Sequence, residues 1–454
     1  MQKEDSLTRR EFLGKAALLG SSLTLAAGTA KKSSAQLNNA AVPPPSRIGA
    51  GFIGVGVRGT ELLQASQKIY GIDIVAACDL YKGHLERALE LTGGKLVTSG
   101  KYEEVLARKD IDAVVLALPD HWHKKALLDS LAAGKHVYIE KPLTHKLEEG
   151  DEMVQAVEKS KKIVQVGSQT LSSGCALQAR DLIRSGRLGQ ITMIEAKMLR
   201  YSSLSACYYP IPPDASPENI DWKRFLGEAP QREFDPKRFF QWRLFWDYSG
   251  GLTTDLFVHM ISITHYLMGV EEPESVTGFS DIYYWKNYRE VPDQITALVS
   301  YPQGFVLKLT TTVNNGHPEP MLVIYGTEGT LEYDGPKMKY YCEPRQESFS
   351  YATNSWPTKT VEQFKQILNL NDRQQPYASQ QASAGEAMSF KAGEGDDSDV
   401  AHLRNFYDAI RTGSKVIEDI GFGANAVRVG HMINMACKTG KVVHWNRKAQ
   451  KVEV

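Results

Sequence analysis

Three glycines, Gly54, Gly56 and Gly59, have the spacing Gly-x-Gly-x-x-Gly. They follow the apolar run 48–53, so the loop falls where a buried strand would turn into a helix. Glycines at these positions permit a tight turn and a close approach of the backbone to a pyrophosphate, whose charge a helix N-terminus stabilises. This stretch therefore predicts a dinucleotide site rather than a purely structural glycine turn.

A second apolar run, 72–78, ends at Asp79. A carboxylate at the end of this strand reaches the adenosine ribose of NAD and repels the 2′-phosphate of NADP. We therefore expect NAD as the cofactor, with Val57 and Arg58 of the glycine loop also in contact with it.

The tripeptide Glu140-Lys141-Pro142 follows another apolar run, so it falls at the carboxyl edge of the predicted sheet, where ligands bind. A lysine there can donate to a substrate oxygen and stabilise charge on it. The alternative is an ion pair with Glu140 or a surface lysine. We assign Glu140 and Lys141 to the cofactor edge, and Lys141 also to catalysis and substrate binding.

Asp255 and His259 are four residues apart in a predicted helix, 252–268. Residues at this spacing share one helical face, and a carboxylate beside an imidazole raises its basicity, as a proton shuttle requires. The alternative is a capping aspartate and an unrelated core histidine.

A further polar group, Pro119-Asp-His-Trp-His123, follows the strand predicted at 113–118. We assign Pro119 and His123 to the cofactor edge; a polar cluster at a helix start is the alternative. A metal site built from His121, His123, Asp255 and His259 has no recognisable ligand spacing, so no metal is predicted.

Aromatic residues are dense in 242–248, directly before the helix that carries Asp255. Aromatic faces stack on the C–H faces of sugar rings while a few polar groups bind the hydroxyls. We therefore predict that Arg243 and Trp246 contact a sugar. The alternative is that this segment is ordinary core packed under a long loop.

The elements that position these residues fall into two patterns. Up to residue 168, unbroken apolar runs alternate with amphipathic helical segments, which indicates a doubly wound parallel sheet of the Rossmann type. After residue 169, β-branched and alternating runs separated by hairpin signals predict an α+β domain with a large, mostly antiparallel sheet. The expected segments are a leader (1–35), a linker (36–46), a dinucleotide-binding domain (47–168), an α+β domain (169–345), a polar insertion loop (346–398) and a C-terminal helical segment (399–454).

Composition excludes several classes of protein. Lys+Arg and Asp+Glu are both 53 in 454 residues, so nothing points to nucleic acid or to an anionic membrane surface. Five scattered cysteines without zinc or redox spacing argue against a disulfide framework.

The first 35 residues read as an export signal. Arg9 and Arg10 precede a mildly apolar run, 16–27, that is too short and too rich in Gly and Ser to span a bilayer. We expect export of the folded chain by the twin-arginine machinery to the periplasm or beyond, without a stable membrane anchor. A disordered basic N-terminus is the alternative.

Together these motifs resemble the glucose–fructose oxidoreductase / inositol 2-dehydrogenase (Gfo/Idh/MocA) family. The resemblance rests on the glycine loop, on Pro119–His123, on Glu140-Lys141-Pro142 and on Gly250-Gly251 with Asp255 and His259. It implies an oxidoreductase that acts on a CH–OH group with NAD, and a homo-oligomer formed through the open sheet.

The resemblance also implies roles for the three catalytic candidates. His259 would be the general base, Lys141 would polarise the same substrate oxygen, and Asp255 would orient His259 and bind a neighbouring hydroxyl. Ser262 stands where many relatives have an aspartate, so the identity of the substrate does not carry over.

Three functions stay open at this point. They are an exported oxidoreductase on a sugar, cyclitol or glycoside with a cofactor that is exchangeable or tightly bound, an NAD-dependent glycosidase working by oxidation and elimination, and a non-catalytic sugar- or cofactor-binding protein. The Asp255–His259 pair favours the first, because the glycosidase relatives lack that aspartate.

Overall fold

The computed structural model describes residues 47–343, 350–367, 388–393 and 395–454. The leader expected at 1–35 and the linker expected at 36–46 lie outside these ranges. Within them, no helix combines the length and the apolar character needed to cross a bilayer.

Six parallel strands form the first sheet, in the order β3-β2-β1-β4-β5-β6. This confirms the doubly wound sheet that the unbroken apolar runs predict. The order reverses between β1 and β4, and ligands of such sheets bind outside the carboxyl ends of the strands at this switch point. The strands are β1 (Ile48–Ile53), β2 (Ile72–Cys78), β3 (Val97–Ser99), β4 (Ala113–Leu116), β5 (His136–Glu140) and β6 (Val164–Gly167).

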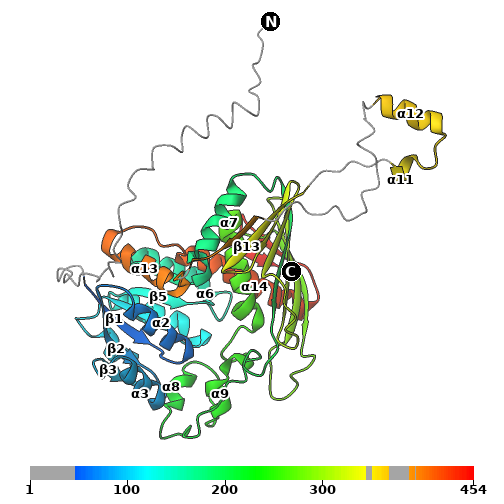
Figure 1. Ribbon diagram of the computed structural model, residues 1–454. Helices are drawn as coiled ribbons and strands as arrows, with labels where there is room; N and C mark the ends of the chain where they lie inside the picture. Colours follow the sequence, from blue (N-terminus) through cyan, green and yellow to red (C-terminus); the bar gives the residue numbers. More distant parts are fainter. Residues whose placement is uncertain (1–46, 344–349, 368–387, 394) are drawn as a thin grey trace, which may run out of the picture. The chain divides into compact units, whose positions relative to one another are not determined.

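Helices cover this sheet, and one of them comes from the C-terminal part of the chain (Figure 1). Helix α13 packs against α2, where the hydroxyls of Tyr407 and Ser66 lie 3.2 Å apart. The helical elements around the first sheet are α2 (Val57–Gln67), α3 (Lys82–Leu91), α4 (Tyr102–Leu106), η2 (Asp120–Trp122), α5 (His123–Ala132), α6 (Glu149–Ser160) and α13 (Ser398–Thr412).

Ten strands form the second sheet, in the order β14-β13-β12-β11-β7-β10-β9-β8-β15-β16. Only β7 and β10 pair in parallel, so the expectation of a mostly antiparallel sheet is confirmed. The strands are β7 (Ile191–Leu199), β8 (Ser275–Asp281), β9 (Gln294–Tyr301), β10 (Phe305–Thr312), β11 (Leu322–Gly326), β12 (Gly329–Tyr333), β13 (Lys337–Cys342), β14 (Met388–Lys391), β15 (Val443–Asn446) and β16 (Lys451–Glu453).

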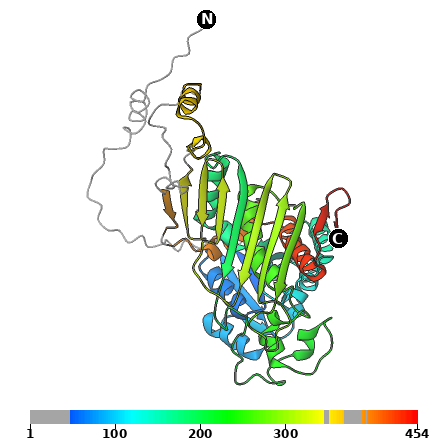
Figure 2. The same cartoon turned by 90° about the vertical axis from the view of Figure 1, so that its right-hand side faces the viewer.

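Burial alternates along these strands, because successive side chains point to opposite faces of the sheet. One face packs on helices, and Figure 2 looks onto the opposite face. Several apolar side chains of these strands are exposed, among them Phe279 and Leu298. The helical elements of this half are η3 (Gln169–Ser172), α7 (Gly174–Arg184), α8 (Trp222–Leu226), α9 (Pro236–Phe240), η4 (Trp242–Leu244), η5 (Thr253–Phe257), α10 (Val258–Met268), α11 (Ser350–Thr353), α12 (Thr358–Ile367) and α14 (Ile420–Thr439).

Two expected segments differ from the structure. The polar loop expected at 346–398 contains α11, α12 and β14 in its described part, and β14 pairs with β13. The helical segment expected at 399–454 ends in β15 and β16, which extend the opposite edge of the sheet. The three strands β14, β15 and β16 are only three or four residues long, too short for the alternating pattern to identify them.

Candidate active site

The glycine loop joins β1 to α2 and forms one wall of a cavity of about 750 Å³. Gly54 has φ +86°, and a Cβ at this residue would overlap the carbonyl oxygen of Ala117 on the neighbouring strand end. A Cβ at Gly59 would overlap the carbonyl oxygen of Gly54, so both glycines are required by the turn itself.

Gly56 has a different role, because its Cα faces the open cavity and a Cβ there would approach only His84, at 3.4 Å. No side chain caps α2, which begins at Val57, so its first N–H groups are free to bind an anion at this wall. Val57 lines the cavity and is 69% exposed. The loop therefore fits a pyrophosphate, as the glycine spacing predicts.

Asp79 lies at the end of β2 and lines the same cavity. Its carboxylate accepts hydrogen bonds from the backbone N–H of Val55 at 2.9 Å and of Tyr81 at 3.0 Å, and it pairs with His84 Nδ1 at 3.1 Å. Burial by itself would raise the pKa of Asp79, but His84 and the two N–H groups lower it below its usual value. An ionised carboxylate at this place favours a ribose hydroxyl over a 2′-phosphate.

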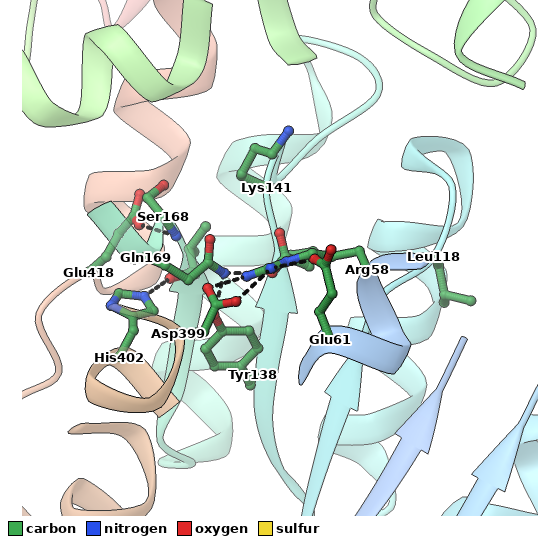
Figure 3. A network of polar contacts seen from close by, with 12 residues as sticks. Arg58, Glu61, Leu118, Tyr138, Lys141, Ser168, Gln169, Asp399, His402 and Glu418 are labelled. Atoms are coloured by element: carbon green, nitrogen blue, oxygen red, sulfur yellow. Dashed lines mark hydrogen bonds and ion pairs between the residues drawn. The ribbon is translucent and has the colours of Figure 1, made fainter. Parts of the chain in front are cut away.

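Arg58 lines the cavity, but acidic side chains hold its guanidinium. It donates to Glu61 at 2.8 Å, to Glu140 at 3.1 Å and to Asp399 at 2.8 and 2.9 Å. Figure 3 shows Arg58 between Glu61 and Asp399, with Lys141 pointing away from this network. The ion pairs neutralise Arg58, so it offers little to a 2′-phosphate.

Glu140 is the last residue of β5 and Lys141 follows it, and the two side chains have different partners. Glu140 lines the cavity and accepts hydrogen bonds from Arg58 and, at 2.6 Å, from Gln169 Nε2. Lys141 Nζ instead donates to Asp255, at 2.9 Å to both its Oδ1 atom and its carbonyl oxygen. The alternative that Lys141 pairs with its neighbour Glu140 is therefore wrong.

The helix expected at 252–268 begins as a π-helical turn, η5, and becomes α-helical only at Val258. Helix α14 packs closely against this turn, because a Cβ at Gly430 would lie only 2.9 Å from the carbonyl oxygen of Thr253. The π-helical turn changes the angular spacing of side chains, so the i, i+4 rule for a shared face does not apply at Asp255.

Asp255 consequently binds cations rather than an imidazole. Its Oδ1 accepts from Lys141 Nζ at 2.9 Å and from Arg243 Nε at 3.4 Å. Burial would raise the pKa of Asp255, but Lys141 and Arg243 lower it far below its usual value. Among the described side chains, none of the hydrogen bonds joins Asp255 to His259, so the expected orienting contact is not formed.

His259 lies on the first turn of α10 and lines the cavity together with Lys141. Burial and the neighbouring charge of Lys141 lower the pKa of His259 well below its usual value, and Asp255 opposes this shift. The imidazole is therefore neutral at pH 7 and able to accept a proton.

Some residues of the segment Pro119–His123 line the cavity, and others are buried in the core. Pro119 and Trp122 line the cavity. His123 does not: it is fully buried, with Nδ1 2.7 Å from the carbonyl oxygen of Pro142 and Nε2 2.9 Å from that of Leu118. The expected cofactor contact of His123 is therefore wrong, because both ring nitrogens are used to join the turns after two strands.

The metal alternative fails on similar grounds. His121 Nε2 lies 2.9 Å from the carbonyl oxygen of Phe225, and Lys141 occupies the carboxylate of Asp255. No group of three metal-ligating side chains occurs in the part of the chain that the structure describes.

The aromatic run 242–248 contributes a different tryptophan from the expected one. Trp242 and Arg243 line the cavity, whereas Trp246 does not and donates from Nε1 to the carbonyl oxygen of Glu290 at 3.0 Å. Trp246 as a sugar contact is therefore wrong. The run lies at the cavity, but only the fold shows which of its side chains turn inward.

Sequence reasoning missed several residues of the site. Asp120 is buried, accepts a hydrogen bond from the Gly250 N–H at 3.2 Å, and has its pKa raised to about 6 by burial and by Asp255. Ser262, which replaces an aspartate found in many relatives, is buried and does not line the cavity.

The long connection before Trp242 adds further cavity residues for which aromatic density was the only signal: Tyr209, Phe225, Phe239 and Phe240.

Comparison with known proteins agrees with this geometry. Residues 48–168 match the family described as "Oxidoreductase family, NAD-binding Rossmann fold", and residues 176–332 match the GFO/IDH/MocA C-terminal domain. Levoglucosan dehydrogenase in complex with NADH and levoglucosan superposes with a TM-score of 0.66 at 18% identity, covering 88% of this chain and 99% of that one. Aldose-aldose oxidoreductase from Caulobacter crescentus, complexed with glycerol, gives 0.64 at 17% identity, covering 88% and 99%. At such identities these likenesses concern the fold.

Curated relatives match over shorter stretches. Glycosyl hydrolase family 109 protein 1 of Shewanella sp. (strain ANA-3) is 29% identical over 166 residues, which are 34% of this chain and 35% of the relative. Inositol 2-dehydrogenase of Salmonella paratyphi B is 26% identical over 157 residues, 34% of this chain and 47% of the relative. The matches thus span between a third and a half of these relatives. Since both halves of the chain match one family, the protein belongs to the Gfo/Idh/MocA family of oxidoreductases and carries its NAD-binding Rossmann domain.

Proposed function

We propose that this protein is an NAD-dependent oxidoreductase that transfers a hydride between the cofactor and a sugar, cyclitol or glycoside hydroxyl. One observation carries the proposal: Lys141 and His259 line the same cavity as the glycine loop and Asp79. Proton-handling groups thus share one space with the features that fit a dinucleotide. NAD, when bound, supplies the hydride acceptor.

The side chains divide the proton chemistry between them. His259, neutral at pH 7, takes the proton of the substrate hydroxyl. Lys141 uses two of its three N–H donors on Asp255, which leaves one for the substrate oxygen. Asp255 holds Lys141 in place, so in this proposal it is a partner of the lysine rather than of the histidine.

We also propose that the cofactor is tightly held, because the connection 201–248 is fastened over the cavity. The Tyr81 hydroxyl donates to Asp214 at 2.6 Å, Asp221 N–H donates to the carbonyl oxygen of Leu80 at 2.9 Å, and Arg224 pairs with Glu103 at 2.9 Å. Tyr81 belongs to the same apolar cluster as Phe225 and Phe239 of this connection. Dissociation of the cofactor would require many of these contacts to open.

A second candidate is an NAD-dependent glycosidase, favoured by the names of the glycosyl hydrolase family 109 relatives. One experiment separates the two: purify the protein, look for co-purified NAD(H), and screen free sugars and aryl glycosides. Absorbance change at the nicotinamide band with free sugars supports the oxidoreductase. Release of aglycone without net NADH supports the glycosidase, and bound NAD without any turnover supports a binding protein.

Two further proposals concern location and assembly. Arg9-Arg10 supports export by the twin-arginine machinery to the periplasm or beyond, and replacing both by lysine should retain the protein inside the cell. The exposed apolar face of the ten-stranded sheet, which includes Phe279, supports a homo-oligomer. Light scattering at the mass of one chain would refute that assembly.

A further inference from the structure

The charged side chains that line the cavity are distributed unevenly. Its three carboxylates, Asp79, Glu61 and Glu140, all pair with residues at the cofactor wall: Asp79 with His84, and the other two with Arg58. Next to Asp255 the lining side chains with a charge include Lys141 and Arg243, which both contact the carboxylate of Asp255. This end of the cavity therefore presents cations, whereas a site for neutral polyols gains from carboxylates that accept hydroxyl protons.

Asp255 does not change this balance. It does not line the cavity, it is only 9% exposed, and its carboxylate is bound by Lys141 at 2.9 Å. Lys141 and Asp255 thus neutralise each other. Asp120, the other buried carboxyl group nearby, binds the Gly250 N–H, and none of the hydrogen bonds among the described residues joins it to Arg243. Asp255 and Asp120 both raise the pKa of Arg243, but among the described residues neither accepts a hydrogen bond from its terminal nitrogens, so these nitrogens remain available to a ligand.

The guanidinium of Arg243 is held in place, but few of its N–H groups donate hydrogen bonds to the described residues. Its Nε makes a long contact of 3.4 Å with Asp255, and its plane lies over Trp242, 4.2 Å from the ring centroid. Within the described ranges its two terminal nitrogens have no hydrogen-bond partner, and the side chain is 26% exposed. A fixed, unoccupied guanidinium fork matches the two oxygens of a carboxylate or another oxyanion.

Resting on the function proposed above, we propose that the substrate is an anionic sugar, in the first place a sugar acid, whose carboxylate binds to the terminal nitrogens of Arg243. The reacting hydroxyl then lies at Lys141 and His259, and Trp242 packs on the sugar beside the ion pair. Sulfate and phosphate esters share the oxyanion chemistry, and the experiment distinguishes them.

The test is a set of matched ligands titrated calorimetrically into the NAD-loaded protein. Glucose is compared with glucuronate, galactose with galacturonate, and glucose with its 6-phosphate and 6-sulfate. We expect a uronate to bind at least 30-fold more tightly than its neutral partner, because charge-assisted bidentate hydrogen bonds are the strong ones. If one of the esters exceeds the uronate, the anion is that ester; equal or weaker binding of every anion overturns the proposal.

Variants assign the effect to one residue. Arg243→Gln should bring the ratio of anion to neutral-sugar affinity close to one, and Arg243→Lys, which keeps the charge without the fork, should retain part of it. Arg232→Gln is the matched control, because Arg232 lies in the same connection, is 42% exposed, pairs with Asp247 and does not line the cavity. A ratio that survives in Arg243→Gln, or falls equally in the control, contradicts the assignment.

The outcomes also separate this inference from the proposed function. If Arg243→Gln fails to fold, judged by circular dichroism and NAD binding, Arg243→Lys and the ligand set on the unaltered protein still decide. Absence of hydride transfer with every ligand would defeat the oxidoreductase while leaving the affinity ratio measurable. Turnover of neutral sugars with no preference for anions would defeat only the inference.

Discussion

Lys141 Nζ lies 2.9 Å from both the Oδ1 atom and the carbonyl oxygen of Asp255, and each of the two side chains is 12% exposed. The bond to the carbonyl oxygen joins the end of β5 to the π-helical turn η5, so it couples the two halves of the fold at the cavity. The ion pair thereby fixes a positive charge beside His259, where the proposed reaction needs a proton acceptor.

Lys141→Met should weaken both stability and catalysis. Removing one partner of a buried ion pair costs about 3–5 kcal/mol, and Arg243 near Asp255 should keep the loss toward the lower figure. Loss of the donor to the substrate oxygen should lower kcat by roughly 10²- to 10⁴-fold. Denaturant unfolding and steady-state kinetics measure the two effects.

The control for this variant is Lys125→Met. Lys125 pairs with Asp129 at 2.8 Å with half of its side chain exposed, and such surface pairs contribute about 0–1 kcal/mol. Equal losses of stability in the two variants would mean that the Lys141–Asp255 pair contributes no more to the free energy of unfolding than a surface ion pair does.

The pH dependence of the rate follows from the lowered pKa of His259. A general base with a depressed pKa stays unprotonated through neutrality, so kcat/KM should be flat from pH 6.5 to 8 and fall only at lower pH. In Lys141→Met the repelling charge is gone, so the acid limb should move to higher pH. An acid limb that stays in place, or moves to lower pH, would show that His259 is not the titrating base.

Gly56→Ala should separate cofactor binding from folding. Its Cβ would meet only His84 at 3.4 Å within the protein, but it would occupy the wall against which the pyrophosphate lies. We expect an unchanged melting temperature and at least a tenfold weaker affinity for NAD, measured by fluorescence titration.

Two other glycines bracket that result. Gly54→Ala should fail to fold, because φ is +86° and the Cβ would overlap Ala117. Gly100→Ala has nothing within 4 Å and should change neither property. Normal NAD affinity in Gly56→Ala would mean that the cofactor does not approach this loop.

Asp79→Asn tests the choice between NAD and NADP. The amide keeps the size of the side chain but removes the charge that opposes a 2′-phosphate. The ratio of the dissociation constants for NADP and NAD should fall about tenfold, because roughly 1.4 kcal/mol of discrimination is a factor of ten. Glu90→Gln, an exposed carboxylate on α3, should leave the ratio unchanged. An unchanged ratio in Asp79→Asn would locate the discrimination elsewhere.

Glu418→Gln should stabilise the protein increasingly as the pH rises above about 5. Glu418 is 1% exposed, accepts a hydrogen bond from the Ser168 N–H at 3.0 Å (Figure 3), and has its pKa raised to about 8 by burial. Between pH 4.5 and 8 the unfolded chain therefore binds fewer protons than the folded protein, and stability falls as pH rises.

The amide of Glu418→Gln escapes that loss and keeps an acceptor for Ser168. Its melting temperature should exceed that of the unaltered protein at pH 8 and equal it near pH 5, with a difference on the order of a few kcal/mol at pH 8. A difference that does not depend on pH would contradict the raised pKa.

The sequence by itself determined the features that depend on local patterns. Unbroken apolar runs identified five of the six parallel strands, because both faces of such a sheet are buried, but the three-residue edge strand β3 was missed. The glycine spacing located the turn after β1, since the positive φ of Gly54 and the close contact at Gly59 exclude side chains. Lys141 and His259, which the family resemblance singled out among open alternatives, both line the cavity.

Only the tertiary structure decided which partners these residues have. Asp255 binds Lys141 rather than His259, and it lies in a π-helical turn that local spacing does not reveal. Arg58 is neutralised by Asp399, a residue 341 positions later in the chain. Trp242 rather than Trp246 faces the cavity, since the orientation of a long connection depends on what it packs against. Residue types are local information, whereas charge balance and orientation arise from contacts between distant segments.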